Sequence, residues 1–303
     1  MPTKETIVAA FKQLQIHICD TLAAKDGKEK FHIEEWQHHA QGGGVTRILQ
    51  NGNIIEKGGV NFSAVGGELP SKIATALQVI PQTFFATGIS IVLHPCNPFV
   101  PIIHMNVRYF ELADGTYWFG GGIDVTPHYI IPEQATFFHT TMKQVVDAFQ
   151  PGLYTTHKQN ADNYFYIPHR NETRGIGGTF FDRLTGTENY SKQDIFEYCC
   201  NTARTFPIIY TKLMDNHSLP FTPENKKWQL VRRGRYVEFN LVYDKGTKFG
   251  LDTNGRIESI LMSLPSTACW EYNYTPAENS PEYLTQKYLK KDIDWIHSPP
   301  VLQ

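Results

Sequence analysis

The sequence predicts an α+β fold, in which a mostly antiparallel sheet carries helices packed on its faces. Residues 88–127 contain three apolar and aromatic runs separated by turn signals at residues 95–98 and 113–115, a pattern typical of three consecutive strands. Asn51-Gly52 lies between two further apolar runs and indicates a β-hairpin. The helical patterns flank these strands rather than alternate with them, and no repeat or linker-like stretch interrupts the chain. An antiparallel sheet is therefore favoured over a parallel one.

Helix starts are predicted where a capping residue or an N-terminal proline precedes an apolar stripe. These starts lie at Thr3, Pro132, Ser191, Thr222 and Ser280. A further helical stretch covers about residues 154–167, and Pro207 is expected to kink or end the helix that follows Ser191. We expect two more strands at residues 236–243 and 257–264, with Gly255 and Arg256 in the turn between them.

The composition is that of a folded globular protein. Of the 303 residues, 41% are hydrophobic and 13% are aromatic, and the formal net charge of −2 argues against nucleic acid as a partner. The five cysteines include no C-x-x-C pair, so neither a disulfide framework nor a thiolate zinc site is indicated. No run approaches the roughly 18 consecutive apolar residues of a membrane span, and the N-terminal residues lack a secretory or transit pattern. We expect a cytoplasmic protein without an integral membrane segment.

Polar side chains recur at alternate positions along the three central strands. Because side chains on a strand alternate between its faces, polar groups from all three strands converge if the strands pair in register. The groups concerned are Ser90 and His94 on the first strand, His104, Asn106 and Arg108 on the second, and Trp118, Gly120, Gly122 and Asp124 on the third. Such groups are costly to bury, and the glycines leave room for a ligand. A ligand pocket is therefore favoured over a solvated surface.

Four arginines lie next to glycine or on this polar strand face: Arg108, Arg170, Arg174 and Arg256. Arginine binds carboxylates through a two-pronged fork and keeps its charge, so the set suits a ligand with several carboxylates. The alternative for each arginine is an ion pair with an aspartate or glutamate of the same chain. Taken together with the neighbouring aromatic residues, the four indicate a flat, apolar ligand that carries several negative charges.

Two residues of this face have side chains suited to proton transfer. Asp124 could accept hydrogen bonds from ligand N–H groups or act as a base, and equally it could cap a turn or a helix. His104 could act as a general acid. His94, His104, His139 and His169 could instead hold a divalent metal together, although no spacing motif supports such a site.

Seven motifs, in this order along the chain, resemble those of the oxygen-dependent coproporphyrinogen III oxidases. They are Gly42-Gly43-Gly44, SIVLHP at 90–95, HMNVRYF at 104–110, WFGGGIDVTP at 118–127, His169-Arg170, RGIGG at 174–178 and RRGRYVEFN at 232–240. The resemblance implies a single domain over residues 1–303, with a large, flat antiparallel sheet sandwiched between helices. It also implies a homodimer, with about residues 236–270 as the dimer-forming part.

The activity implied by this resemblance is the oxidative decarboxylation of coproporphyrinogen III, in which two propionates become vinyl groups and protoporphyrinogen IX is formed in haem biosynthesis. O2 would be the co-substrate, and no organic cofactor would be needed. The resemblance assigns His104 as the proton donor and Asp124 as the carboxylate that holds the pyrrole nitrogens. It puts Ser90, Asn106, Val107, Arg108, Asn254, Gly255 and Arg256 on the substrate, and Arg174 is added to this set as a further binding arginine.

Two questions stay open at the level of sequence. A divalent metal on His94, His104, His139 and His169 is compatible with the resemblance, but we expect no strict requirement for it. The same pocket could also belong to a non-catalytic tetrapyrrole or haem carrier, or to a hydrolase with a histidine-bound metal. Release of CO2 from coproporphyrinogen III in air distinguishes the oxidase from both alternatives.

Overall fold

A seven-stranded sheet forms the centre of the computed structural model, which describes residues 1–38, 41–71, 74–75, 78–252 and 255–301. Its strand order is β1-β2-β3-β4-β5-β6-β9, and every neighbouring pair is antiparallel. The strands are β1 (His32–Gln37), β2 (Gln41–Gln50), β3 (Ile55–Glu68), β4 (Thr83–Pro95), β5 (Ile102–Leu112), β6 (Tyr117–Thr126) and β9 (Gly178–Leu184). The predicted α+β class and the hairpin at Asn51-Gly52 are confirmed. The two edge strands, β1 and β9, were not predicted.

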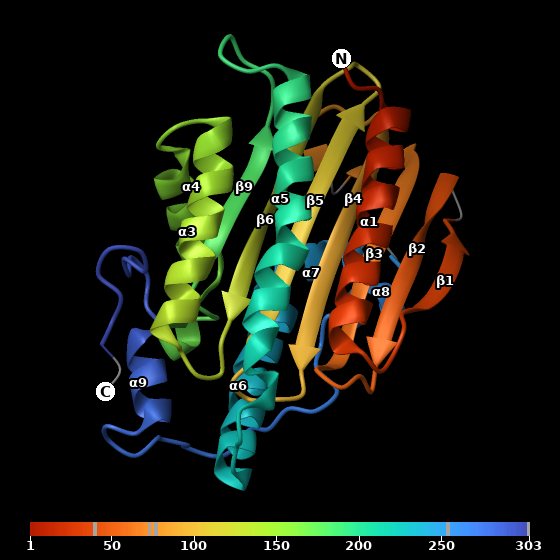
Figure 1. Cartoon of the computed structure of the whole chain (residues 1–303). Coiled ribbons are helices and arrows are strands. Elements are labelled where there is room, and N and C mark those ends of the chain that lie inside the picture. Colours follow the sequence, from red (N-terminus) through yellow and green to blue (C-terminus); the bar gives the residue numbers. More distant parts are fainter. Residues whose placement is uncertain (39–40, 72–73, 76–77, 253–254, 302–303) are drawn as a thin grey trace.

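Within the described residues, four helices cover one face of the sheet (Figure 1). They are α1 (Lys4–Asp26), α3 (Pro132–Phe149), α4 (Leu153–Tyr164) and α5 (Lys192–Leu213). The predicted caps at Thr3 and Ser191 are present, the latter as a complete capping box with Asp194. Pro207 does not end α5, because the buried stripe of this helix continues to Leu213.

On the opposite face lie the helices α6 (Pro223–Val242), α7 (Lys245–Asp252) and α8 (Ile257–Leu261) (Figure 1). Tyr236 of α6 packs against Val92 and Ile102 at one end of this face. The C-terminal helix α9 (Pro281–Tyr288) begins at the predicted Ser280 cap. The other elements given for the described residues are short: β7 (Tyr166–Ile167), β8 (Glu172–Thr173), η1 (Pro168–Arg170) and η2 (Met214–Ser218). The sheet is thus enclosed by helices on both sides, as the resemblance implied.

The strands predicted at residues 236–243 and 257–264 are wrong. Residues 236–242 are the last turns of α6, and Ile257–Leu261 forms α8. The helix α6 starts at the Thr222 capping box and buries Trp228, Arg232, Tyr236 and Phe239 at helical spacing. A short apolar run does not distinguish strand from helix by itself, and here the long amphipathic stripe that starts at Thr222 determines the outcome.

The hydrophobic core lies between the sheet and the four-helix layer. Alternate residues of the central strands, such as Val60, Ile89, Ile91, Val107 and Ile123, are fully buried in it. A shift of one residue would move this entire set to the other face, so the core fixes the register of the sheet. The polar residues between them must therefore point to the opposite face, which we call the polar face. Among the described residues, no helix is long and apolar enough to cross a membrane.

Candidate active site

The register of β4, β5 and β6 brings the predicted polar residues together. Asn106 lies opposite both Ser90 and Gly122, His104 lies opposite Asp124, and Arg108 lies opposite Gly120. Directly opposed residues of antiparallel strands point to the same side of the sheet. The convergence expected from the period of two is thus confirmed, and these residues form the centre of the polar face.

Asp124 is the most buried acid of this centre, with 2% of its surface exposed. Its Oδ1 lies 2.7 Å from His104 Nδ1 and its Oδ2 accepts a hydrogen bond from Arg174 Nη2 at 2.8 Å. Burial alone would raise the pKa of Asp124, but the charge of Arg174 and the hydrogen bond from His104 outweigh burial and lower it. Asp124 is therefore an ionised strand residue and caps neither a turn nor a helix.

The ionised Asp124 determines which nitrogen of His104 carries the proton. A carboxylate without a proton can only accept a hydrogen bond, so His104 Nδ1 donates to it and Nε2 is the ring nitrogen left to face a ligand. The His104 side chain is one quarter exposed. The pair can therefore pass a proton between Nε2 and a ligand while Asp124 holds the ring in place.

Arg174 is buried against Asp124. Only 2% of its surface is exposed, and its guanidinium carbon lies 4.4–4.7 Å from the ring centres of Phe165, Tyr236 and Phe239. Its Nη1 donates to Asn240 Oδ1 at 2.8 Å. The structure thus pairs Arg174 with Asp124, as a fixed counter-charge, and its expected contact with a substrate stays a prediction.

Arg108 lies flat over a glycine in the open part of the polar face. A Cβ atom at Gly120 would lie 2.8 Å from Nε and Nη2 of Arg108, so only glycine leaves room for this guanidinium. Arg108 Nη1 donates to Asn106 Oδ1 at 2.8 Å, and Nη2 donates to Asp182 Oδ1 at 2.8 Å. Ser90, Asn106 and Arg108 are all half-buried, which leaves part of each side chain open to a ligand.

The other residues expected on the substrate differ in burial and in their hydrogen-bond partners. Val107 is fully buried in the core on the opposite face, so only its backbone belongs to the strand that carries the site. Arg256 precedes α8 and forms an ion pair with Glu34 of β1. This segment is fixed to the polar face because Asn61 Nδ2 donates to the carbonyl oxygen of Ser259 at 2.8 Å. Gly255 is next to Arg256, and Asn254 lies outside the described residues.

Stacked aromatic side chains continue the polar face beyond Arg108. The ring centres of Phe84 and Phe110 are 5.5 Å apart, and those of Phe110 and Trp118 are 4.5 Å apart, with nearly parallel planes. Trp118 was placed on this face by the strand pattern. Asp182 and Glu34 were missed because the edge strands β9 and β1 were not predicted, and Asn240 was missed because residues 236–243 were predicted as a strand and not as the end of α6.

The four histidines considered as metal ligands are not brought together. His139 is fully buried, and both of its ring nitrogens are occupied: Nε2 lies 3.0 Å from the carbonyl oxygen of Ile176 and Nδ1 lies 2.7 Å from the Tyr154 hydroxyl. His169 contacts Tyr243 and Glu238. Across the part of the chain that the structure describes, no group of three or more His, Cys, Asp or Glu side chains is arranged to hold a metal ion.

His94 and His139 are also uncharged at neutral pH. His94 Nε2 lies 2.8 Å from the carbonyl oxygen of Ser263. Burial lowers the pKa of each of these two histidines to about 3. The four histidines expected as ligands lie on separate elements of the fold. His139, with both ring nitrogens hydrogen-bonded, helps to pack α3 against its neighbours.

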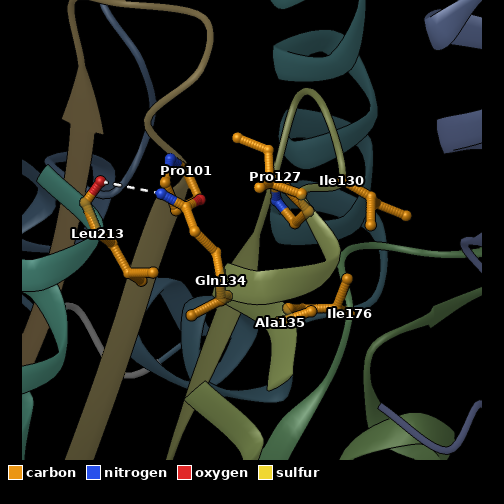
Figure 2. Close-up of a pocket in the computed structure, with 9 residues that line it drawn as sticks. Pro101, Pro127, Ile130, Gln134, Ala135, Ile176 and Leu213 are labelled. Carbon is orange, nitrogen blue, oxygen red and sulfur yellow. Dashed lines mark hydrogen bonds between the residues drawn. The ribbon is translucent and has the colours of Figure 1, made fainter. Parts of the chain in front are cut away.

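A small internal cavity lies away from these residues and does not suit a ligand (Figure 2). It has a volume of about 10 Å³ and is lined mainly by Pro101, Pro127, Ile130, Ile176 and other apolar side chains. Gln134 Nε2 donates to the carbonyl oxygen of Leu213 at its wall. This volume corresponds to roughly one water molecule. The polar face, on which Ser90, Asn106 and Arg108 are only half-buried, is the better candidate.

The fold and the site together define a protein whose antiparallel sheet carries, on one face, a coupled carboxylate and imidazole beside half-buried polar side chains. The sequence pattern of the family described as coproporphyrinogen III oxidase matches residues 6–295. The chain belongs to this family, and the resemblance seen in its motifs is confirmed.

Curated relatives from animals and plants match over nearly the same span. The chain is 46% identical over 299 residues to the mitochondrial oxygen-dependent coproporphyrinogen-III oxidase of Homo sapiens. The aligned span covers 94% of this chain and 65% of the human protein. The Rattus norvegicus protein of the same name is 45% identical over 300 residues, a span that covers 94% of this chain and 67% of the rat protein. A chloroplastic relative from Glycine max, also an oxygen-dependent coproporphyrinogen-III oxidase, is 44% identical over 301 residues, a span that covers 94% of this chain and 77% of the relative. The chain thus spans about two thirds of the length of the mammalian relatives.

Proposed function

We propose that this protein is an oxygen-dependent coproporphyrinogen III oxidase, which converts two propionates of coproporphyrinogen III to vinyl groups and so forms protoporphyrinogen IX in haem biosynthesis. Membership of the family supports the class of enzyme, an oxidoreductase with O2 as acceptor. The observation that carries the proposal is the buried, ionised Asp124, held between His104 and Arg174 on a glycine-lined sheet face.

Each decarboxylation removes CO2 and a hydride equivalent from one propionate. O2 takes the two electrons together with one further proton, so that the balanced products are a vinyl group, CO2 and H2O2. Asp124 accepts hydrogen bonds from pyrrole N–H groups and stabilises the positive charge that develops on the ring as O2 accepts electrons. His104 exchanges the proton through Nε2. The electron-rich porphyrinogen supplies the electrons, so the proposal includes no organic cofactor.

The substrate would lie along the polar face with its propionates toward the arginines. Ser90, Asn106 and Arg108 offer their side chains, Val107 offers its backbone, and Gly255 and Arg256 approach from the segment before α8. Asn254 is included on the resemblance alone. Arg174 holds Asp124 and stays in the proposed set of binding residues.

We do not assign a metal to the four histidines, because both nitrogens of His139 are occupied by its neighbours. Turnover is expected to continue after chelation and dialysis. Complete loss of activity that one added divalent ion restores would contradict this proposal.

The remaining proposals concern assembly and location. We propose a single domain over residues 1–303, cytoplasmic, that forms a homodimer through about residues 236–270. Exposed apolar side chains in this segment, Leu241, Val242, Leu251, Ile257 and Trp270, support the dimer. Sedimentation of the protein and of Leu241→Glu tests it: the first should be a dimer and the second a monomer. Cell fractionation tests the location.

The test of the activity is incubation of the purified protein with coproporphyrinogen III in air. The oxidase should release CO2 and form vinyl groups in equal amounts. A tetrapyrrole carrier would bind the ring without releasing CO2, and a hydrolase would leave the propionates intact.

A further inference from the structure

Both arginines on the open part of the polar face are paired with a carboxylate from an edge strand. Arg108 Nη2 donates to Asp182 Oδ1 on β9 at 2.8 Å, and Arg256 Nη2 is paired with Glu34 Oε1 on β1. Strands β1 and β9 are the two ends of the strand order. One carboxylate therefore stands at each side of the face on which the substrate is proposed to lie.

The exposure of these pairs distinguishes them from the pair formed by Arg174 and Asp124. The Arg108 and Asp182 side chains are 37% and 45% exposed, and those of Arg256 and Glu34 are 23% and 49% exposed, whereas Arg174 and Asp124 are almost completely buried. An exposed pair contributes little to stability, because water and salt screen it. Separating a buried pair leaves uncompensated charges and is strongly unfavourable. The exposed pairs can exchange partners at little cost, and the buried pair cannot.

We infer that Asp182 and Glu34 are placeholder carboxylates, which hold Arg108 and Arg256 in the free protein and give way to two propionates of the substrate. The inference rests on the proposed function, which supplies a substrate with four carboxylates. It names two binding determinants on strands that carry none of the residues assigned from the family motifs.

The local geometry of each arginine suits such an exchange. The guanidinium of Arg108 stays over Gly120 and keeps its Nη1 bond to Asn106, so only the partner of Nη2 needs to change. Arg256 Nη1 is buried and has no hydrogen-bond partner among the described residues, so it becomes a donor for an incoming carboxylate once the Arg256 side chain leaves Glu34. A propionate can therefore replace Asp182 or Glu34 without rearranging the strands.

The test is a fluorescence titration with coproporphyrin III, which has four propionates, and mesoporphyrin IX, which has two. Asp182→Asn removes the competitor of the ligand carboxylate, so coproporphyrin III should bind about twofold to fivefold more tightly, as expected for loss of a weak exposed pair. Mesoporphyrin IX should gain less. Glu34→Gln should behave in the same way. The matched control is Glu188→Gln, which removes the same charge from the exposed connection after β9 and should leave both affinities unchanged.

A double-mutant cycle separates exchange from a general effect of charge. In an Arg108→Gln background, Asp182→Asn should no longer change the affinity for coproporphyrin III. The inference is overturned if Asp182→Asn weakens binding, if Glu188→Gln tightens it equally, if the effect persists without Arg108, or if the unaltered protein does not bind coproporphyrin III. Failure of the proposed function is a different result, namely binding without CO2 release from coproporphyrinogen III by the unaltered protein.

Discussion

The polar face has a closed end and an open end, and the two use the same residue types differently. At the closed end, under α6, Arg174 and Asp124 are buried and locked together among three aromatic rings. At the open end, Arg108 and Asp182 form a similar pair that is about 40% exposed. Burial makes the first pair permanent and exposure makes the second exchangeable. The closed end therefore sets the charge of the reacting group, and the open end receives the carboxylates of the substrate.

The largest effect is expected from Asp124→Asn, which keeps the shape of the side chain and removes its charge. Turnover should fall below detection, because neither the pyrrole N–H groups nor His104 would meet a carboxylate. The rate of CO2 release measures this, with thermal unfolding as the check that the variant is folded. Activity within about tenfold of the unaltered protein, roughly 1.4 kcal/mol of barrier, would remove Asp124 from the mechanism.

Next in size is the loss of stability in Arg174→Met. This variant leaves the Asp124 carboxylate buried without its counter-charge, so the free energy of unfolding should fall by about 3–5 kcal/mol. The matched variant at the open end, Arg108→Gln, should change stability by less than about 0.5 kcal/mol, because its ion pair is exposed. Urea denaturation of both variants measures the contrast. Equal losses of unfolding free energy in the two variants would contradict the difference between a buried ion pair at one end of the face and an exposed pair at the other.

Gly120→Ala should act on binding more than on stability. The added methyl group displaces the guanidinium of Arg108, so KM for coproporphyrinogen III should rise roughly tenfold, about 1.4 kcal/mol, the equivalent of a lost charged hydrogen bond. In an Arg108→Gln background the same change should have little further effect. A tenfold rise in KM that persists without Arg108 would show that Gly120 is required by the sheet itself and not by the position of Arg108.

The smallest effect concerns pH. The folded pKa of His139 is about 3, and its unfolded value is about 6.5. Between these values the unfolded chain binds the extra proton, so the free energy of unfolding falls as the pH is lowered below about 6.5, by roughly 1 kcal/mol per pH unit for this group. His139→Gln should reduce that slope between pH 6 and pH 5, whereas replacing the exposed His297 should not. An unchanged slope in His139→Gln would contradict the burial of a neutral imidazole.

The central strands could be predicted because their side chains follow a strict period of two. The alternation through Ser90, Asn106 and Asp124 placed the polar residues on one face, and the structure confirmed their register. The edge strands escaped prediction since β1 and β9 each have one strongly exposed stretch and lack an apolar run long enough to mark them.

The part of the site that depends on long-range packing could not be predicted. Residues 236–243 contain a short apolar run that fits either a strand or a helix, and only the fold shows that Tyr236 and Asn240 reach Arg174 from α6. The sequence also suggested ion pairs within the chain as the alternative for each of the four arginines. All four form them: Arg108 with Asp182, Arg170 with Glu238, Arg174 with Asp124, and Arg256 with Glu34. Burial is what distinguishes the pair of Arg174 and Asp124 from the other three, more exposed pairs, and burial could not be predicted from the sequence.

A crystal structure with bound coproporphyrin III would show whether the closed and open ends of the polar face act together on one ligand. We expect the macrocycle over Gly120 and Gly122, with pyrrole nitrogens within hydrogen-bond distance of Asp124 and with propionates on Arg108 and Arg256 in place of Asp182 and Glu34. A macrocycle bound away from this face, with both arginines still on their own carboxylates, would contradict this expectation.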